Sequence, residues 1–211
     1  MPEAPEDTYN RLLAKHDLVG LDGDKALWLI GTLTDLSKRL RRTEGLEQAR
    51  RLTEELHLRE LSADRKALSY YFLANVWANL RVLAGEDRGE WEKPELEREL
   101  YNLRMALRHE ATPGFESERV CQMLTNLANV LFGVGRPVEA IQCWDRALQR
   151  LPHFSMARGN RGHGFFYYAA ALYDSEQHAL MSPLTDRAHS SGPRPGDAQL
   201  YSRGPGSTVG L

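Results

Sequence analysis

His163, in the stretch RGNRGHG, is the histidine whose surroundings most resemble a functional site. A catalytic or metal-binding histidine needs a carboxylate or thiol that the fold can bring to it. No Asp, Glu or Cys lies nearby in the sequence, so a packed or solvated histidine is the favoured interpretation. Both phosphate-binding glycine loops, GxGxxG and GxxxxGK[ST], are absent, and no serine sits in a nucleophile elbow. The sequence therefore predicts no enzymatic activity, no cofactor and no metal site.

The two cysteines, Cys121 and Cys143, fall at packing positions of predicted helices. Free cysteine is among the most buried residue types, and disulfides are rare in a reducing compartment. We therefore expect two reduced thiols in the core rather than a disulfide or a metal site.

The composition is that of an ordinary soluble protein, with 211 residues, 42% hydrophobic, 27% charged and a formal net charge of −2. The acidic start of the chain lacks the basic and apolar regions of a secretory signal. The longest apolar run, residues 164–173, is about half the ~20 residues that a membrane-spanning helix needs. These features predict a cytoplasmic protein without a membrane segment.

Four cations crowd the end of the first predicted helix. They complement the negative end of the helix dipole, and no aromatic residues are interleaved with them as on many nucleic-acid-binding surfaces. The sequence therefore argues against a nucleic-acid partner. The four are Lys38, Arg39, Arg41 and Arg42.

Residues 121–154 have the pattern of two helices joined by a tight turn. Gly135 and Pro137 separate two apolar stripes with helical spacing. The small Ala128 and Ala140 predict a close helix crossing, and the large Trp144 predicts a neighbouring hairpin that leaves room for it. The stripes are Leu124, Leu127, Ala128 and Leu131, then Ala140, Ile141, Trp144, Ala147 and Leu148.

Further helices are predicted on both sides of this unit. Asp24 is a plausible cap for a helix at 24–42, and Gly45 is expected to form the turn after it. The next helix has its stripe at Leu46, Ala49, Leu52, Leu56 and Leu58. Helices at 62–84 and 94–110 flank an insertion at 84–96, where Trp91 is expected to fold back onto the hairpin. Another hairpin begins near residue 155, and the Gly/Pro/Ser-rich residues 182–211 predict a disordered tail.

The segment 121–154 resembles a tetratricopeptide (TPR) repeat along its full length, and its span equals the ~34-residue period of that family. The resemblance implies an all-α fold in which antiparallel helical hairpins stack as a short α-solenoid. The expected hairpins are 24–58, 62–110, 116–152 and 155–181, in a repeat domain at 24–181 that follows an N-terminal leader at 1–23. A protein or peptide partner in a concave groove is the implied function.

The same resemblance selects the groove residues. Four asparagines occupy two matching positions of successive first helices, where peptide-binding members of the family hydrogen-bond the backbone of a bound peptide. The alternative is that these asparagines are only consensus residues of the repeat. Tyr71, Thr125 and Gly159 stand where carboxylate-clamping members carry lysine, so capture of an acidic C-terminal tail is not expected. The predicted groove residues are Asn75, Asn126, Asn129, Asn160 and His163.

The order of the segments YFLANVWANL, WEKPELE and LTNLANVLFGVGRPVEAIQCWDRAL also resembles the N-terminal part of certain bacterial proteins. Those proteins join TPR-like repeats to a C-terminal HEPN domain, a helical domain that often acts as a ribonuclease in defence or toxin systems. The alternative function is therefore a truncated or regulatory half of such a nuclease. The nuclease motif, Arg and His separated by four to six residues, fits several places in this chain and selects no catalytic residue.

A repeat array buries one side of each unit against the next, so its last unit needs a polar cap. Phe165, Tyr168, Ala169 and Leu172 form an apolar stripe that only a short helix near Ser175 can cover. The sequence therefore predicts an exposed face and self-association through residues 160–180.

Overall fold

The computed structural model describes residues 4–83, 94–112 and 115–174. Within these ranges it contains eight helices and no strand, which confirms the all-α class. The chain divides into two compact units between residues 114 and 115. The predicted solenoid and its domain limits at 24–181 stay predictions. The predicted tail at 182–211, the helix expected near Ser175 and Trp91 lie outside the described residues.

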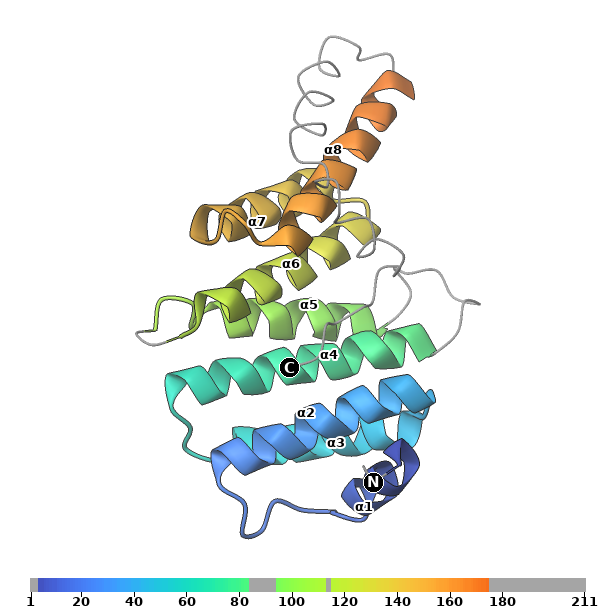
Figure 1. Cartoon of the computed structure of the whole chain (residues 1–211), viewed down its shortest axis with the longest axis vertical. Helices are drawn as coiled ribbons and strands as arrows, with labels where there is room; N and C mark the ends of the chain where they lie inside the picture. The colour runs from blue at the N-terminus through green and yellow to red at the C-terminus, as the bar shows by residue number, and fades with distance from the viewer. Residues whose placement is uncertain (1–3, 84–93, 113–114, 175–211) are drawn as a thin grey trace. The chain divides into compact units, whose positions relative to one another are not determined.

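The described part of unit 1 contains five helices (Figure 1). The helices α2 and α3 pack together as a pair, as do α4 and α5, and α4 also contacts α2 and α3. The described helices are α1 (Pro5–Leu13), α2 (Gly23–Leu40), α3 (Thr43–His57), α4 (Ala63–Leu83) and α5 (Pro94–Leu107).

Helix α1 lies within the predicted leader and packs against α2 and α3. Tyr9 is fully buried, and its hydroxyl accepts a hydrogen bond from the backbone N–H of Gly45 at 3.1 Å. Gln48 of α3 donates to the backbone carbonyl of Leu13 at 2.9 Å and also to that of Lys15. The leader thus supplies a helix that is fixed to the first helical pair.

Three predicted details of this pair are wrong. The α2 cap is Asp22, whose side chain accepts from the backbone N–H of Lys25 at 2.9 Å, whereas Asp24 forms an ion pair with Arg65 at 2.6 Å. Gly45 lies inside α3, buried beside the Tyr9 ring, and the chain turns earlier. Leu58 follows the end of α3 and is 88% exposed. Sequence spacing does not show that Tyr9, 36 residues earlier in the chain, packs against Gly45.

The turn between α2 and α3 is made by Arg41, which adopts the left-handed conformation (φ 54°, ψ 45°). Its N–H bonds the carbonyl of Lys38, and the next N–H bonds that of Ser37, a helix ending in which glycine is preferred. We expect Arg41→Gly to raise the free energy of unfolding by about 1 kcal/mol, because a side chain with a Cβ is strained there. Chemical denaturation measures this, and a lower midpoint for Arg41→Gly would contradict it.

Helix α4 forms a buried ion pair with α5. Both Nε and Nη2 of Arg81 lie 2.9 Å from Oε2 of Glu99, which is 4% exposed although it is charged. Beside this pair, the guanidinium of Arg98 lies 4.4 Å from the ring centre of the buried Trp77. Helices α4 and α5 are therefore joined by charge as well as by apolar packing.

Unit 2 contains α6 (Ser117–Gly133), α7 (Pro137–Arg150) and α8 (Ser155–Asp174). Gly135 (φ 76°) and Pro137 at the first turn of α7 form the predicted turn. Apart from the half-buried Leu148, both predicted stripes of the central hairpin are buried. A Cβ on Gly164 of α8 would stand 2.5 Å from the ring of Trp144. The space that the sequence predicted for Trp144 in the neighbouring hairpin is therefore provided by a glycine.

The expected state of the cysteines is confirmed. Cys121 and Cys143 are free and buried. The Cys121 thiol donates to the carbonyl of Ala147 at 3.2 Å, and burial raises the pKa of this thiol. None of the described helices combines the length and apolar character needed to cross a bilayer.

The predicted exposure of the α8 stripe is wrong. Phe165, Ala169 and Leu172 are buried, and Tyr168 is half-buried. The exposed rings of α8 are instead Phe166, Tyr167 and Tyr173. The spacing of apolar residues did not show which side is covered because α8 has large apolar residues on several sides.

Candidate functional site

Helices α6 and α8 contact each other and bring two predicted groove residues together. The side-chain Nδ2 of Asn160 on α8 donates a hydrogen bond to Oδ1 of Asn129 on α6 at 2.9 Å. Both side chains are half-buried, so they are held by the helix packing and still reach the surface. We call Asn129 and Asn160 the amide pair, and the candidate site is described around it.

The bond within the amide pair leaves binding capacity unused. An amide side chain has two N–H donors and one carbonyl oxygen that can accept. Since Asn129 uses its oxygen and Asn160 one N–H, the amino group of Asn129 and the oxygen of Asn160 have no further hydrogen bond within the described residues. The pair thus offers a donor and an acceptor next to each other.

One to two helical turns beyond the amide pair, three aromatic rings lie together. We call them the aromatic cluster, and they belong to Phe132, His163 and Tyr167. The ring centres of His163 and Tyr167 are 4.5 Å apart, and that of Phe132 lies 6.2 Å and 6.1 Å from them. Trp144 packs against Phe132 from the core side at 5.9 Å. His163 and Tyr167 are exposed, so the aromatic cluster can contact an apolar side chain of a ligand.

The surroundings of these groups are electrically balanced. Arg161 forms an ion pair with Asp145 of α7 at 2.7 Å, and Arg136 forms one with Glu139 at 2.6 Å. The charge of Arg161 is therefore already neutralised, which favours an uncharged ligand surface.

The other predicted groove residues are placed differently. Asn126 lies one turn before Asn129 on α6, is half-buried and already interacts with another group of the chain. Asn75 belongs to α4 in unit 1, where its backbone carbonyl accepts from the Asn79 side chain at 2.8 Å. The α6/α8 face, as the structure describes it, consists of the amide pair, Asn126 and the aromatic cluster.

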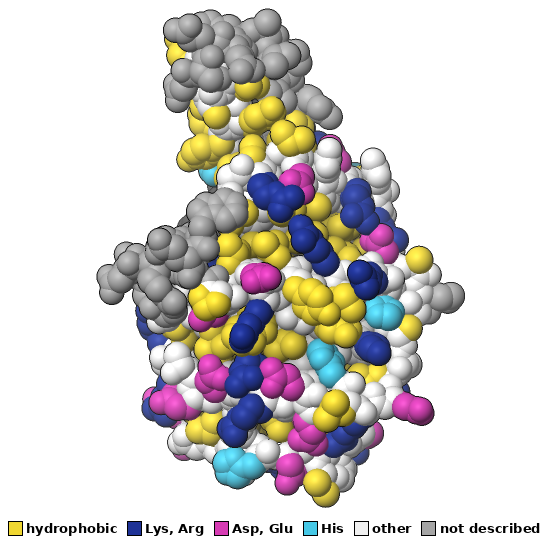
Figure 2. Space-filling view, turned by 180° about the vertical axis from the view of Figure 1, so that it is seen from behind, with side chains coloured by type: hydrophobic (Ala, Val, Ile, Leu, Met, Phe, Trp, Pro, Cys, Tyr) yellow, Lys and Arg dark blue, Asp and Glu magenta, His cyan; other side chains and the backbone are white. Residues whose placement is uncertain are grey.

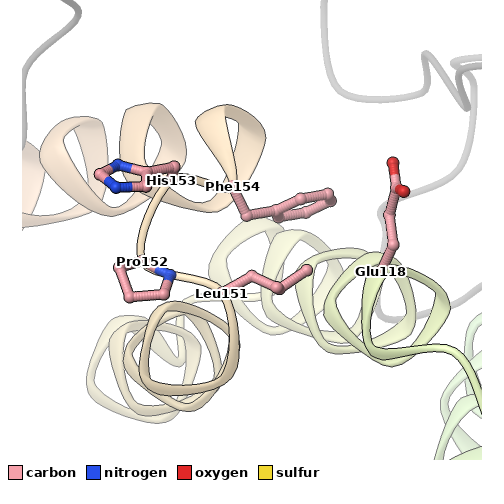
Figure 3. A pocket seen from close by; sticks show the side chains of 5 residues that line it. All are labelled: Glu118, Leu151, Pro152, His153 and Phe154. Atoms are coloured by element: carbon pink, nitrogen blue, oxygen red, sulfur yellow. The ribbon is translucent and has the colours of Figure 1, made fainter.

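Two other places with chemical groups do not make convincing sites. A shallow hollow of about 230 Å³ between the start of α6 and the α7–α8 loop is lined by Glu118, Leu151, Pro152, His153 and Phe154 (Figure 3). Leu151 and Phe154 extend side by side toward the Glu118 side of the hollow. Pockets for small ligands occupy roughly 300–1,000 Å³, so this hollow is too small and too open for that role.

His57 and Ser69 form a pair that resembles a catalytic dyad. Nε2 of His57 lies 2.9 Å from Oγ of Ser69, and burial, together with the charge of Lys66, lowers the pKa of His57. However, Ser69 is fully buried, and its hydroxyl donates to the Lys66 carbonyl at 2.8 Å. A substrate cannot reach the Ser69 hydroxyl, so the pair stabilises the α3–α4 packing.

The described residues also contain no group of three or more metal-ligating side chains.

Comparison with known proteins adds no assignment, since no family model and no curated protein matches the chain. The resemblances to TPR repeats and to TPR–HEPN proteins remain predictions. Sequence reasoning selected Asn129, Asn160 and His163 but missed Phe132 and Tyr167. The signal was present in the helical spacing, because Phe132 follows Asn129 by three residues and Tyr167 follows His163 by four.

Proposed function

We propose that the protein is a binding module that holds an extended peptide segment of another protein on the α6/α8 face. The observation that carries this proposal is the amide pair, because its unused donor and acceptor match what an extended peptide presents. Each peptide unit has one C=O and one N–H to pair. The Asn129 amino group can donate to the C=O, and the Asn160 oxygen can accept from the N–H.

The aromatic cluster supports the same function. His163 follows Asn160 by three residues, so it lies about 4.5 Å further along the helix axis. A peptide residue whose backbone is held by the amide pair is followed two positions later, roughly 7 Å away, by a side chain on the same side. That side chain can reach the rings, and an apolar one gains most from them. The alternative is that the Asn129–Asn160 bond only stabilises the α6/α8 packing.

Selection from a phage-displayed library of random peptides on the whole chain tests the proposal. We expect selected peptides to bind the Asn129→Ala/Asn160→Ala double variant about tenfold or more weakly, since each lost hydrogen bond costs about 0.5–1.5 kcal/mol. Fluorescence anisotropy with labelled peptides gives the Kd values. Gln142→Ala is the matched control, because it removes an exposed amide of α7. Failure to select any peptide, or equal affinity for the double variant, would count against peptide binding.

A further inference from the structure

The outward side of α8 between residues 163 and 173 is exposed and largely aromatic. Phe166, Tyr167 and Tyr173 are 59%, 51% and 55% exposed, and Ala170 is exposed between them. From residue 162 to residue 173 the sequence contains no Asp, Glu, Lys or Arg. We define the outer stripe as His163, Phe166, Ala170 and Tyr173, which recur at i, i+3, i+7 and i+10 on one side of the helix.

This surface differs from the other exposed apolar residues. Elsewhere they lie mostly singly along the described sequence, whereas α8 exposes three large rings within eight residues, 166–173. The C-terminal half of α8 extends beyond α6 and α7 in Figure 1. Hydrophobic side chains gather over that half at the top of Figure 2. Contiguous exposed apolar surface usually marks a contact with another molecule.

We propose that the outer stripe binds the outer stripe of a second copy of this chain, in an antiparallel helix pair centred on Ala170. A largely apolar surface without Asp, Glu, Lys or Arg favours a partner surface of the same kind, and the outer stripe itself is such a surface. Ala170 is the small residue at its middle and lets two helices approach closely. Phe166 lies four residues before Ala170, and Tyr173 lies three residues after it. In the antiparallel pair, Phe166 of one copy therefore lies beside Tyr173 of the other copy.

The antiparallel direction follows from symmetry and electrostatics. A two-fold axis uses the same patch on both copies, and it reverses the direction of a helix that lies across it. The helix dipoles then oppose each other, which is the favourable arrangement. His163 of the outer stripe and Tyr167 at its edge also belong to the aromatic cluster, whereas the amide pair lies outside the outer stripe.

The available area predicts a weak dimer. An aromatic side chain buries 150–250 Å² when fully covered, so three half-exposed rings offer roughly 300 Å² per copy. A standard stable interface buries about 800 Å² per partner. We therefore expect reversible association that depends on protein concentration, rather than a permanent dimer.

Sedimentation velocity of the whole chain over a wide concentration range tests association. We expect the weight-average mass to rise toward that of a dimer for the wild type, and to stay monomeric for Phe166→Glu/Tyr173→Glu. Tyr101→Glu is the matched control, since Tyr101 is a 57% exposed ring of unit 1, and it should behave as the wild type. A wild type that stays monomeric throughout, or a double variant that associates equally well, would overturn the proposal.

Cysteine cross-linking tests the geometry without disturbing the rings. Because Cys121 and Cys143 are buried, Ala170→Cys adds the accessible thiol. A residue on the two-fold axis meets its own copy within the ~4.4–6.8 Å between Cα atoms that a disulfide requires. Mild oxidation should therefore link Ala170→Cys into covalent dimers several-fold faster than Ala171→Cys, which is turned by 100° around the helix. Equal rates would overturn the antiparallel pairing on Ala170.

Discussion

Arg81→Leu is expected to lower the free energy of unfolding by about 3–5 kcal/mol, because it removes the cation nearest to a buried carboxylate. Glu99 is 4% exposed, and both Nε and Nη2 of Arg81 approach its Oε2 to 2.9 Å. A charge in that position cannot be hydrated by bulk water. The loss measured by urea unfolding therefore includes the cost of keeping the Glu99 carboxylate buried as well as the lost attraction to Arg81.

A second variant separates these two contributions. Arg81→Leu/Glu99→Leu removes both charges, so we expect it to be more stable than Arg81→Leu alone. Arg65→Leu is the matched control, since Arg65 forms a two-point ion pair with Asp24 at 2.8 Å and 2.6 Å in exposed surroundings. Solvent screens that pair, and its loss should change stability far less. Equal losses for Arg81→Leu and Arg65→Leu would contradict this account of Glu99.

Gly164→Ala is expected to lower the free energy of unfolding by about 1–3 kcal/mol, although alanine favours a helix more than glycine does. The new Cβ would stand 2.5 Å from Cζ3 and 3.3 Å from Cη2 of Trp144. The indole is 1% exposed and packs against Phe132, so it has little space to move. Helix α8 must therefore shift away from α7.

Gly133→Ala is the control for Gly164→Ala. Gly133 lies at the end of α6, and a Cβ there would meet no atom within 4 Å. We expect this variant to keep or slightly raise the stability, because only the helix preference changes. Helical circular dichroism during thermal unfolding compares the two. Similar melting temperatures would show that Trp144 does not need the glycine of α8.

The sequence predicted the central hairpin well because its information is local. The stripes from Leu124 to Ala147 follow helical spacing, and Gly135 with Pro137 marks the turn. The role of α1 was not predictable in that way, since Tyr9 bonds Gly45 across 36 residues of sequence. The turn at Arg41 was hidden because glycine is the usual residue in that conformation.

The candidate site was predictable only in part. Matching positions in successive helices pointed to Asn129 and Asn160, but a direct bond between their side chains depends on how α8 packs on α6. The packing of α8 on α7 likewise decides that Arg161 turns to Asp145 rather than to a ligand. Spacing within one helix cannot show either contact. It also could not show that Phe165 is covered and Phe166 is not.

The order in which the helices pack has a consequence for folding kinetics. In unit 1, helix α1 packs on α2 and α3, and helix α4 packs on α2, α3 and α5. The main contacts therefore join helices that are neighbours or next neighbours in the sequence. The same holds for α6, α7 and α8 in unit 2. Contacts close in sequence lose little loop entropy when they form, and such helical proteins fold within microseconds to milliseconds. Each hairpin can therefore form soon after its second helix has been synthesised.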